Sequence, residues 1–91
     1  MRVRLRGRHW QLVRVKNLEA RGDIDSPNIK DKRIRVNIKI KDDTEELLEV
    51  VIHECLHGLV WDLSEETVQE SAVDLAKILY KLGARIHLER G

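Results

Sequence analysis

Residues 50–58 read Val-Val-Ile-His-Glu-Cys-Leu-His-Gly, which places two histidines four positions apart in an apolar run that favours a helix. On a helix, residues i and i+4 lie one turn apart on one face, so the imidazoles of His53 and His57 can bind one metal ion. Glu54 projects beside that pair, where a carboxylate can accept a proton from an attacking water. Two neutral nitrogen ligands with a neighbouring carboxylate are the set that a zinc hydrolase needs. The stretch therefore predicts a zinc site with Glu54 as general base.

The helix that carries the histidines is expected to cover residues 43–60. Asp43 and Glu46 have the spacing of a capping box, which marks a helix start. The expected buried stripe repeats at helical spacing and consists of Leu48, Val51, Ile52, Cys55, Leu56 and Leu59. The two histidines lie roughly opposite this stripe, so we expect them to face a cleft rather than the main core.

A second helix is expected over residues 64–83, directly after a short turn. Gly83 has the position of a C-cap, and Asp62 and Ser64 are candidate caps at the other end. Its apolar stripe is formed by Val68, Ala72, Leu75, Ala76 and Leu79 and reaches Leu82. Because the turn is short, the two helices are predicted to be antiparallel neighbours.

The first 41 residues contain the strand signals. Val3 and Leu5 alternate with arginines, a second strand continues from Trp10 to Val15, and the clearest alternation covers residues 33–41. Residues 17–32 hold the only proline and read as an ordered loop, in which aspartates are more often turn formers than cation ligands. We predict an α+β fold in one domain of residues 1–91. We expect a small antiparallel or mixed sheet of three to four strands that packs on an antiparallel helix pair.

Composition limits the classes of protein. One cysteine excludes an internal disulfide, no run has the length of a membrane span, and the basic N-terminus has no apolar stretch behind it. We therefore expect a cytoplasmic protein that does not enter membranes. The formal net charge is +1, yet residues 1–41 carry 13 Lys and Arg against 4 Asp and Glu, whereas residues 42–91 carry 4 against 12. This basic part could meet nucleic acid or an acidic protein.

A catalytic zinc usually takes three protein ligands and leaves a position for water, so a third ligand is expected on the second helix. Counting away from a turn centred near residue 61 brings Glu66 level with His57, and Glu70 level with His53. We therefore predict Glu66 as the ligand, and Glu70 as the acceptor of a hydrogen bond from an imidazole or as the alternative ligand. Asp62 and Glu65 stay open as further alternatives.

The arrangement from residue 50 to residue 83 resembles a compressed gluzincin, the thermolysin-like branch of the zincin metallopeptidases. It is also similar to small phage-associated proteins classed as metallopeptidases, in which the second helix follows almost at once. The resemblance implies a glutamate ligand with a second acid one turn later, which Glu66 and Glu70 match in spacing. The interval between the histidines and that glutamate is far shorter than in the large peptidases.

The same resemblance implies an edge strand that lies over the active-site helix and pairs with an extended peptide substrate. Residues 33–41 are the matching candidate, so Arg35, Val36 and Asn37 are predicted to bind substrate. No residue stands out as a transition-state donor. The candidates for that role are His9, His87, Tyr80 and Arg35.

The leading hypothesis is thus a zinc-dependent peptidase that acts on a peptide or protein. The alternative is a zinc-containing binding module whose basic sheet contacts nucleic acid or an acidic protein, although Trp10 is the only aromatic candidate for a nucleic-acid platform. A third hypothesis is an inactive zincin kept for interaction. Glu54 argues against it, because a structural site has no use for a general base.

Overall fold

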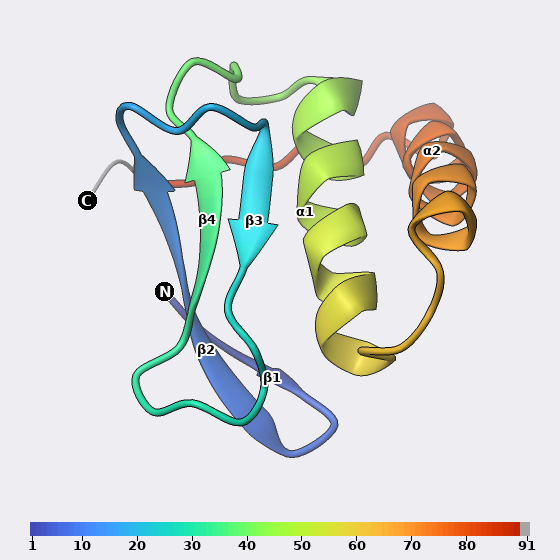
Figure 1. Cartoon of the computed structure of the whole chain (residues 1–91). Helices are drawn as coiled ribbons and strands as arrows, with labels where there is room; N and C mark the ends of the chain where they lie inside the picture. The colour runs from blue at the N-terminus through green and yellow to red at the C-terminus, as the bar shows by residue number, and fades with distance from the viewer. Residues whose placement is uncertain (90–91) are drawn as a thin grey trace.

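A computed structural model describes residues 1–89 and confirms the predicted α+β class (Figure 1). A four-stranded mixed sheet is followed along the chain by two helices. The elements are β1 (Arg2–Leu5), β2 (Arg8–Val15), β3 (Gly22–Ile24), β4 (Arg33–Asn37), α1 (Glu45–Leu59) and α2 (Glu65–Lys81). None of the helices in this described part of the chain is long and apolar enough to cross a membrane.

The strand order in the sheet is β1-β2-β4-β3. β1 and β2 form an antiparallel hairpin, and Arg6 and Gly7 of its two-residue turn both have positive φ, as a primed turn requires. β4 pairs parallel to β2 on one side and antiparallel to β3 on the other. β4 is therefore an interior strand, and β3 is the edge strand beside α1 (Figure 1).

Two features of the sheet differ from the prediction. The segment 17–32, which reads as a loop, contains the edge strand β3. The strand predicted for residues 33–41 ends at Asn37, because the Asn37 side chain closes a turn there. Its Oδ1 accepts from the Lys39 backbone N–H at 2.9 Å, and its Nδ2 donates to the carbonyls of Leu18 and Ala20.

The core lies between the sheet and α1. It is built by one face of the strands, one face of α1 and Leu88 near the C-terminus. The buried cluster consists of Trp10, Leu12, Ile34, Val36, Ile40, Leu47, Val50 and Leu88. Trp10 is only 1 % exposed, and its Nε1 donates to the Asp25 carbonyl, so its indole is unable to serve as a surface platform for nucleic acid.

The burial of α1 also differs from the prediction. Its most buried positions are Leu47, Leu48, Val50, Glu54 and Gly58. Val50, which is outside the predicted stripe, is in the core, whereas Val51 and Cys55 are partly buried and pack against the core cluster. The helix is capped by Thr44 rather than Asp43, since Thr44 Oγ1 accepts from the Leu47 N–H at 3.1 Å.

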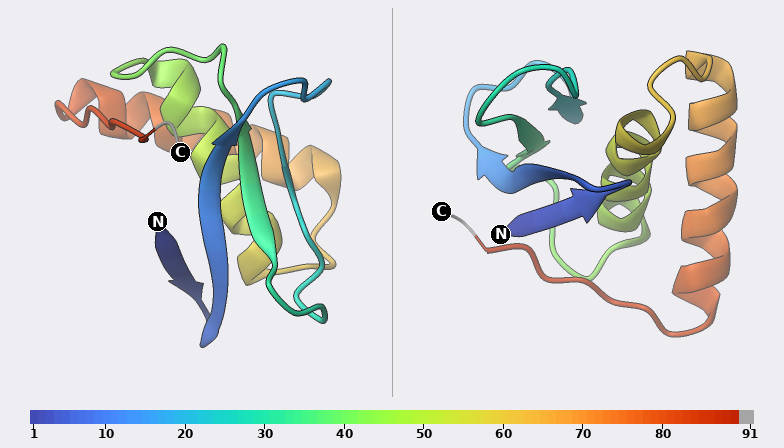
Figure 2. Two further views of the ribbon diagram at one scale, coloured as in Figure 1. Left: turned by 90° about the vertical axis from the view of Figure 1, so that its left-hand side faces the viewer. Right: turned by 90° about the horizontal axis from the view of Figure 1, so that it is seen from below.

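α2 is capped by Ser64, whose Oγ accepts from the Thr67 N–H, and Gly83 follows its end with φ of 96°. Among the helices and strands, α2 contacts only α1, and it buries Val68, Ala72 and Ala76. The helices cross steeply instead of running alongside each other: α2 is nearly end-on in Figure 1 and lies in the plane of the right-hand view of Figure 2, where α1 is foreshortened.

The C-terminal segment is fixed to the sheet by the buried side chain of Arg14. Arg14 Nε donates to the Leu88 carbonyl at 2.9 Å, and its Nη1 donates to the carbonyls of Ile38 and Ile40. Its Nη2 pairs with Asp42 at 2.5 Å, and Asp42 also accepts from the Leu88 N–H. Residues 84–89 thus form a packed tail.

Replacing Asp42 by Asn should lower stability, most clearly near neutral pH. The Leu88 N–H and then the Arg14 guanidinium stabilise the carboxylate, so the pKa of Asp42 lies below its usual range. A depressed carboxyl pKa contributes stability above the unfolded pKa, and this contribution is lost as pH falls through the folded pKa. In urea unfolding, the difference between the unmodified chain and Asp42→Asn should be constant above about pH 5 and shrink below it.

The control is Asp43→Asn. Asp43 is the exposed neighbour with a positive φ that Asn also accepts. An Asp42→Asn effect that did not change with pH, or that Asp43→Asn reproduced, would contradict the assigned role of the Arg14–Asp42 pair.

Candidate metal centre

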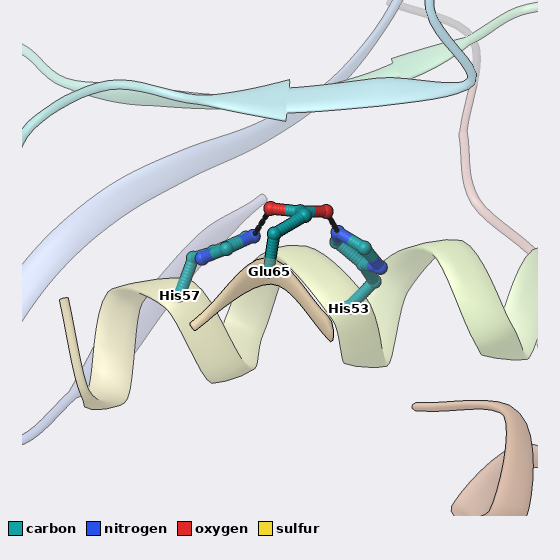
Figure 3. Close-up of side chains that lie close together, drawn as sticks. All are labelled: His53, His57 and Glu65. Carbon is teal, nitrogen blue, oxygen red and sulfur yellow. Dashed lines mark ion pairs between the residues drawn. The ribbon is translucent and has the colours of Figure 1, made fainter. Parts of the chain in front are cut away.

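The side chains of His53, His57 and Glu65 converge at one end of a surface cleft. His53 Nε2 lies 2.8 Å from one carboxylate oxygen of Glu65, and His57 Nε2 lies 2.9 Å from the other. Figure 3 shows the carboxylate placed above the two imidazoles, which project from adjacent turns of α1. The ring centroids are 5.0 Å apart. The predicted pairing of His53 and His57 on one face of a helix is therefore present.

The third residue of the group is Glu65, not Glu66 or Glu70. Glu65 precedes the buried Val68 by three positions, so it lies on the face of α2 that packs against α1. Glu66 and Glu70 are exposed and are not part of the group. Counting residues from the turn failed because the two helices cross instead of running side by side. The acid that reaches both histidines is Glu65, in the first turn of α2. The alternative Asp62 is exposed in the connection and is not in the group either.

Each imidazole Nε2 beside the Glu65 carboxylate has either a proton to donate or a lone pair to offer. With Nε2 protonated, the two contacts are hydrogen bonds to the carboxylate. With both Nε2 atoms unprotonated, three lone-pair donors converge, and a cation between them would offset their repulsion. One donor atom from each of His53, His57 and Glu65 can be chosen so that all three lie within 4.8 Å of one another. Tetrahedral zinc with bonds of about 2.1 Å needs separations of about 3.4 Å, which modest side-chain rotation can supply. The donor set therefore fits zinc in identity and, after small adjustments, in geometry.

Glu54 lies beside the histidines on the side of α1 that faces the sheet. It is 6 % exposed, yet its carboxyl group lines the cleft together with His53 and His57. Burial raises the pKa of Glu54 to about 7, and the negative charges of Asp23 and Glu65 act in the same direction. A carboxyl group with a pKa near neutrality can both accept and return a proton, as a general base must.

The edge strand β3 forms the opposite wall of the cleft. The cleft has a volume of about 440 Å³ and is lined by Gly22, Asp23, Ile24, His53, Glu54, His57, Trp61, Leu63 and Glu65. A Cβ added at Gly22 would lie 2.9 Å from Val50 Cγ1, 3.0 Å from the Arg35 carbonyl oxygen and 3.1 Å from Glu54 Oε2. Glycine at this position therefore allows β3 to approach α1 and Glu54 this closely.

Arg35, Val36 and Asn37 were predicted to bind substrate as part of an edge strand, but β4 is an interior strand. This strand is paired on both sides, so its N–H and C=O groups are unavailable to a further strand. Val36 is fully buried, and Arg35 donates to the carboxylates of Asp23 and Asp25. The free edge beside the histidines belongs to β3, which sequence reasoning missed because a three-residue strand between turn residues has no periodicity to detect.

None of the four suggested transition-state donors lines the cleft around the histidines. His9 lies on β2 with its side chain exposed, His87 pairs with Asp42, and Tyr80 lies under the guanidinium of Arg85. Arg35 is held by Asp23 and Asp25, as described above. Arg21 instead borders a smaller adjoining hollow that contains His53, Glu54 and Glu65, where its Nη2 donates to Glu49 at 2.6 Å.

The basic N-terminal part divides into paired and exposed cations. Arg14, Arg21 and Arg35 are held in intramolecular ion pairs. Arg2 and Arg33 are exposed on opposite sides of Gln11 in the sheet register. Contact of this surface with nucleic acid or an acidic protein stays a prediction, without the aromatic platform that Trp10 would have supplied.

Comparison with protein-family models, with curated proteins and with solved structures finds no match to this chain.

Zinc affinity should depend on Glu65 and not on its neighbour. Glu65→Ala removes one of three donors, so we expect affinity to fall by about 100-fold or more, beyond the usual loss from an outer hydrogen bond. Glu66→Ala, the matched control, should change affinity less than about threefold. Competition against a chromophoric chelator measures both. Equal losses in the two variants, or a chain that binds no zinc, would contradict the assignment.

Proposed function

We propose that this protein is a zinc-dependent metallopeptidase, with His53, His57 and Glu65 as ligands and Glu54 as general base. The observation that carries the proposal is the convergence of two imidazoles and a carboxylate beside a buried carboxyl group, in a cleft bordered by a free strand edge. A purely structural zinc site has four protein ligands and excludes water. Three donors in an open cleft favour a site that does chemistry.

Bound zinc would polarise a peptide carbonyl and lower the pKa of water at the site. Glu54 accepts the proton of the attacking water and returns it to the nitrogen of the leaving amine. The raised pKa of Glu54 suits both transfers, because neither protonation state is strongly preferred near neutral pH. Its position one residue after His53 keeps the carboxyl group close to the ligands without making it one.

The substrate would bind as an extended peptide along the free edge of β3. Arg21 O accepts from the Asn37 N–H and Asp25 N donates to the Arg33 carbonyl, so alternate residues of β3 face β4. The backbone groups of Gly22 and Ile24 consequently face the unpaired side, which borders the cleft. An added strand would use these groups and would carry its scissile bond past the histidines and Glu54.

Glu54→Gln should abolish hydrolysis and leave zinc binding intact. The substitution keeps the side-chain volume but removes the proton acceptor, a loss of about 100- to 10,000-fold in rate. Turnover of a casein or a quenched peptide library by the zinc-loaded chain, with zinc content measured in parallel, tests this. Unchanged hydrolysis, or loss of zinc equal to that in His53→Ala, would refute the role of Glu54.

Substrate pairing should protect particular amides of β3 from hydrogen exchange. When a peptide that is cleaved by the unmodified chain is added to the Glu54→Gln variant, exchange at Gly22 and Ile24 should slow by about tenfold or more. The Asp23 amide faces β4 in the free protein, so it serves as the internal control. Slowing at Asp23 alone, or at none of the three, would place the peptide elsewhere.

A further inference from the structure

The C-terminal half of α2 carries an exposed apolar stripe. Leu75, Ile78, Leu79 and Leu82 follow one another at the i, i+3, i+4 and i+7 spacing, so they share one face of the helix. They are 42 %, 55 %, 38 % and 78 % exposed. Single exposed apolar residues are common, but contiguous groups of this kind mark interaction sites.

This stripe continues the face of α2 that α1 covers only in part. Val68, Ala72 and Ala76 are fully buried, whereas the residues toward the C-terminus lie beyond the contact because the helices cross. Figure 2 shows α2 along one side of the molecule, with its outer side away from the sheet and α1. The stripe, defined as Leu75, Ile78, Leu79 and Leu82, is therefore only partly covered within the described residues.

The charges that flank the stripe indicate which partner fits. Asp74 and Lys81 are seven residues apart, so they lie on the same flank of the helix, nearly two turns from each other. Both are exposed, and no ion pair within residues 1–89 involves either of them. A salt bridge along one helix needs a spacing of three or four, so the two side chains are too far apart to pair within one chain.

A twofold axis between two copies of the chain can bring Asp74 of one copy close to Lys81 of the other. When two identical helices pack antiparallel, residues on the same flank face each other, and residue i opposes residue j as j opposes i. When the twofold axis passes near residues 76–77, Asp74 of one copy and Lys81 of the other differ in level along the helix by only about two residues. The operation creates two ion pairs and seats Leu75 against Ile78 of the second copy. A parallel twofold pair would bring each residue level with its own copy, so Asp74 and Lys81 would stay seven residues apart along the helices.

We propose that this chain forms a twofold homodimer through the antiparallel packing of its α2 stripe. Four partly exposed aliphatic side chains make a small interface compared with the roughly 800 Å² per partner of a standard one. The dimer should therefore be reversible, with a Kd on the order of 1–100 µM. The proposal is independent of the peptidase hypothesis, because the stripe shares no residue with the cleft.

Sedimentation equilibrium of the full chain, from about 1 to 500 µM, tests the dimer directly. The unmodified chain should approach twice its monomer mass at the upper end, and Ile78→Glu should remain monomeric there with an unchanged circular dichroism spectrum. A chain that stays monomeric throughout would overturn the proposal and leave the stripe to another partner. Dimers in which Ile78→Glu associates as tightly as the unmodified chain would also overturn it.

A charge swap tests the antiparallel register. Asp74→Lys and Lys81→Asp each oppose like charges across the axis, so each should weaken self-association by about tenfold, and Lys77→Asp is the matched control away from the stripe. Mixing the two single variants should form a mixed dimer with both ion pairs restored, and the double variant should dimerise like the unmodified chain. Failure of both rescues would overturn the antiparallel dimer.

Discussion

The structure depends on α1 being packed on two sides while a third side stays open. Leu47, Val50 and Gly58 face the sheet, and Leu48 is buried on another side of the helix, a quarter turn away from Leu47. His53 and His57 occupy the strip between those packed sides. Successive residues of a helix are rotated by about 100° around its axis, so each side of α1 carries one row of side chains. The apolar rows that hold the fold together thus also fix the direction in which the imidazoles point.

Close packing on the sheet side then determines the shape of the cleft. Gly58 lies where an added Cβ would be 2.6 Å from Leu5 Cδ1, and Gly22 lies where a Cβ would meet Val50 and Glu54. These two glycines let the sheet approach α1 from both ends of the histidine row. The short distance buries Glu54 and raises its pKa, so the packing of the core and the protonation of the carboxyl group have one cause.

Local patterns were sufficient for much of the fold. Helix α1 was predicted from its periodicity, although its cap is Thr44 and not Asp43. The histidine pair was predicted from its spacing, and β1 and β2 from alternation, because each depends on residues near one another in the chain. The edge strand β3 was not predicted, since three residues among turn formers become a strand only by pairing with β4. Because β3 was missed, the strand that contains Val36 was expected at the edge of the sheet. An interior strand and an edge strand have the same alternation, so the sequence pattern could not tell them apart.

The third residue of the histidine group shows the same limit of local sequence patterns. Counting residues from the turn assumes that the helices run side by side, and the crossing of α1 and α2 is a property of packed surfaces that no spacing encodes. A better signal was present in the chain: Glu65 is three residues before Val68, on the row that α2 buries. Glu65 itself is 70 % exposed and starts a helix, where negative charge is favoured in any case. Its carboxylate therefore contributes little to packing, and it lies over the two imidazoles in a group that could hold a metal ion.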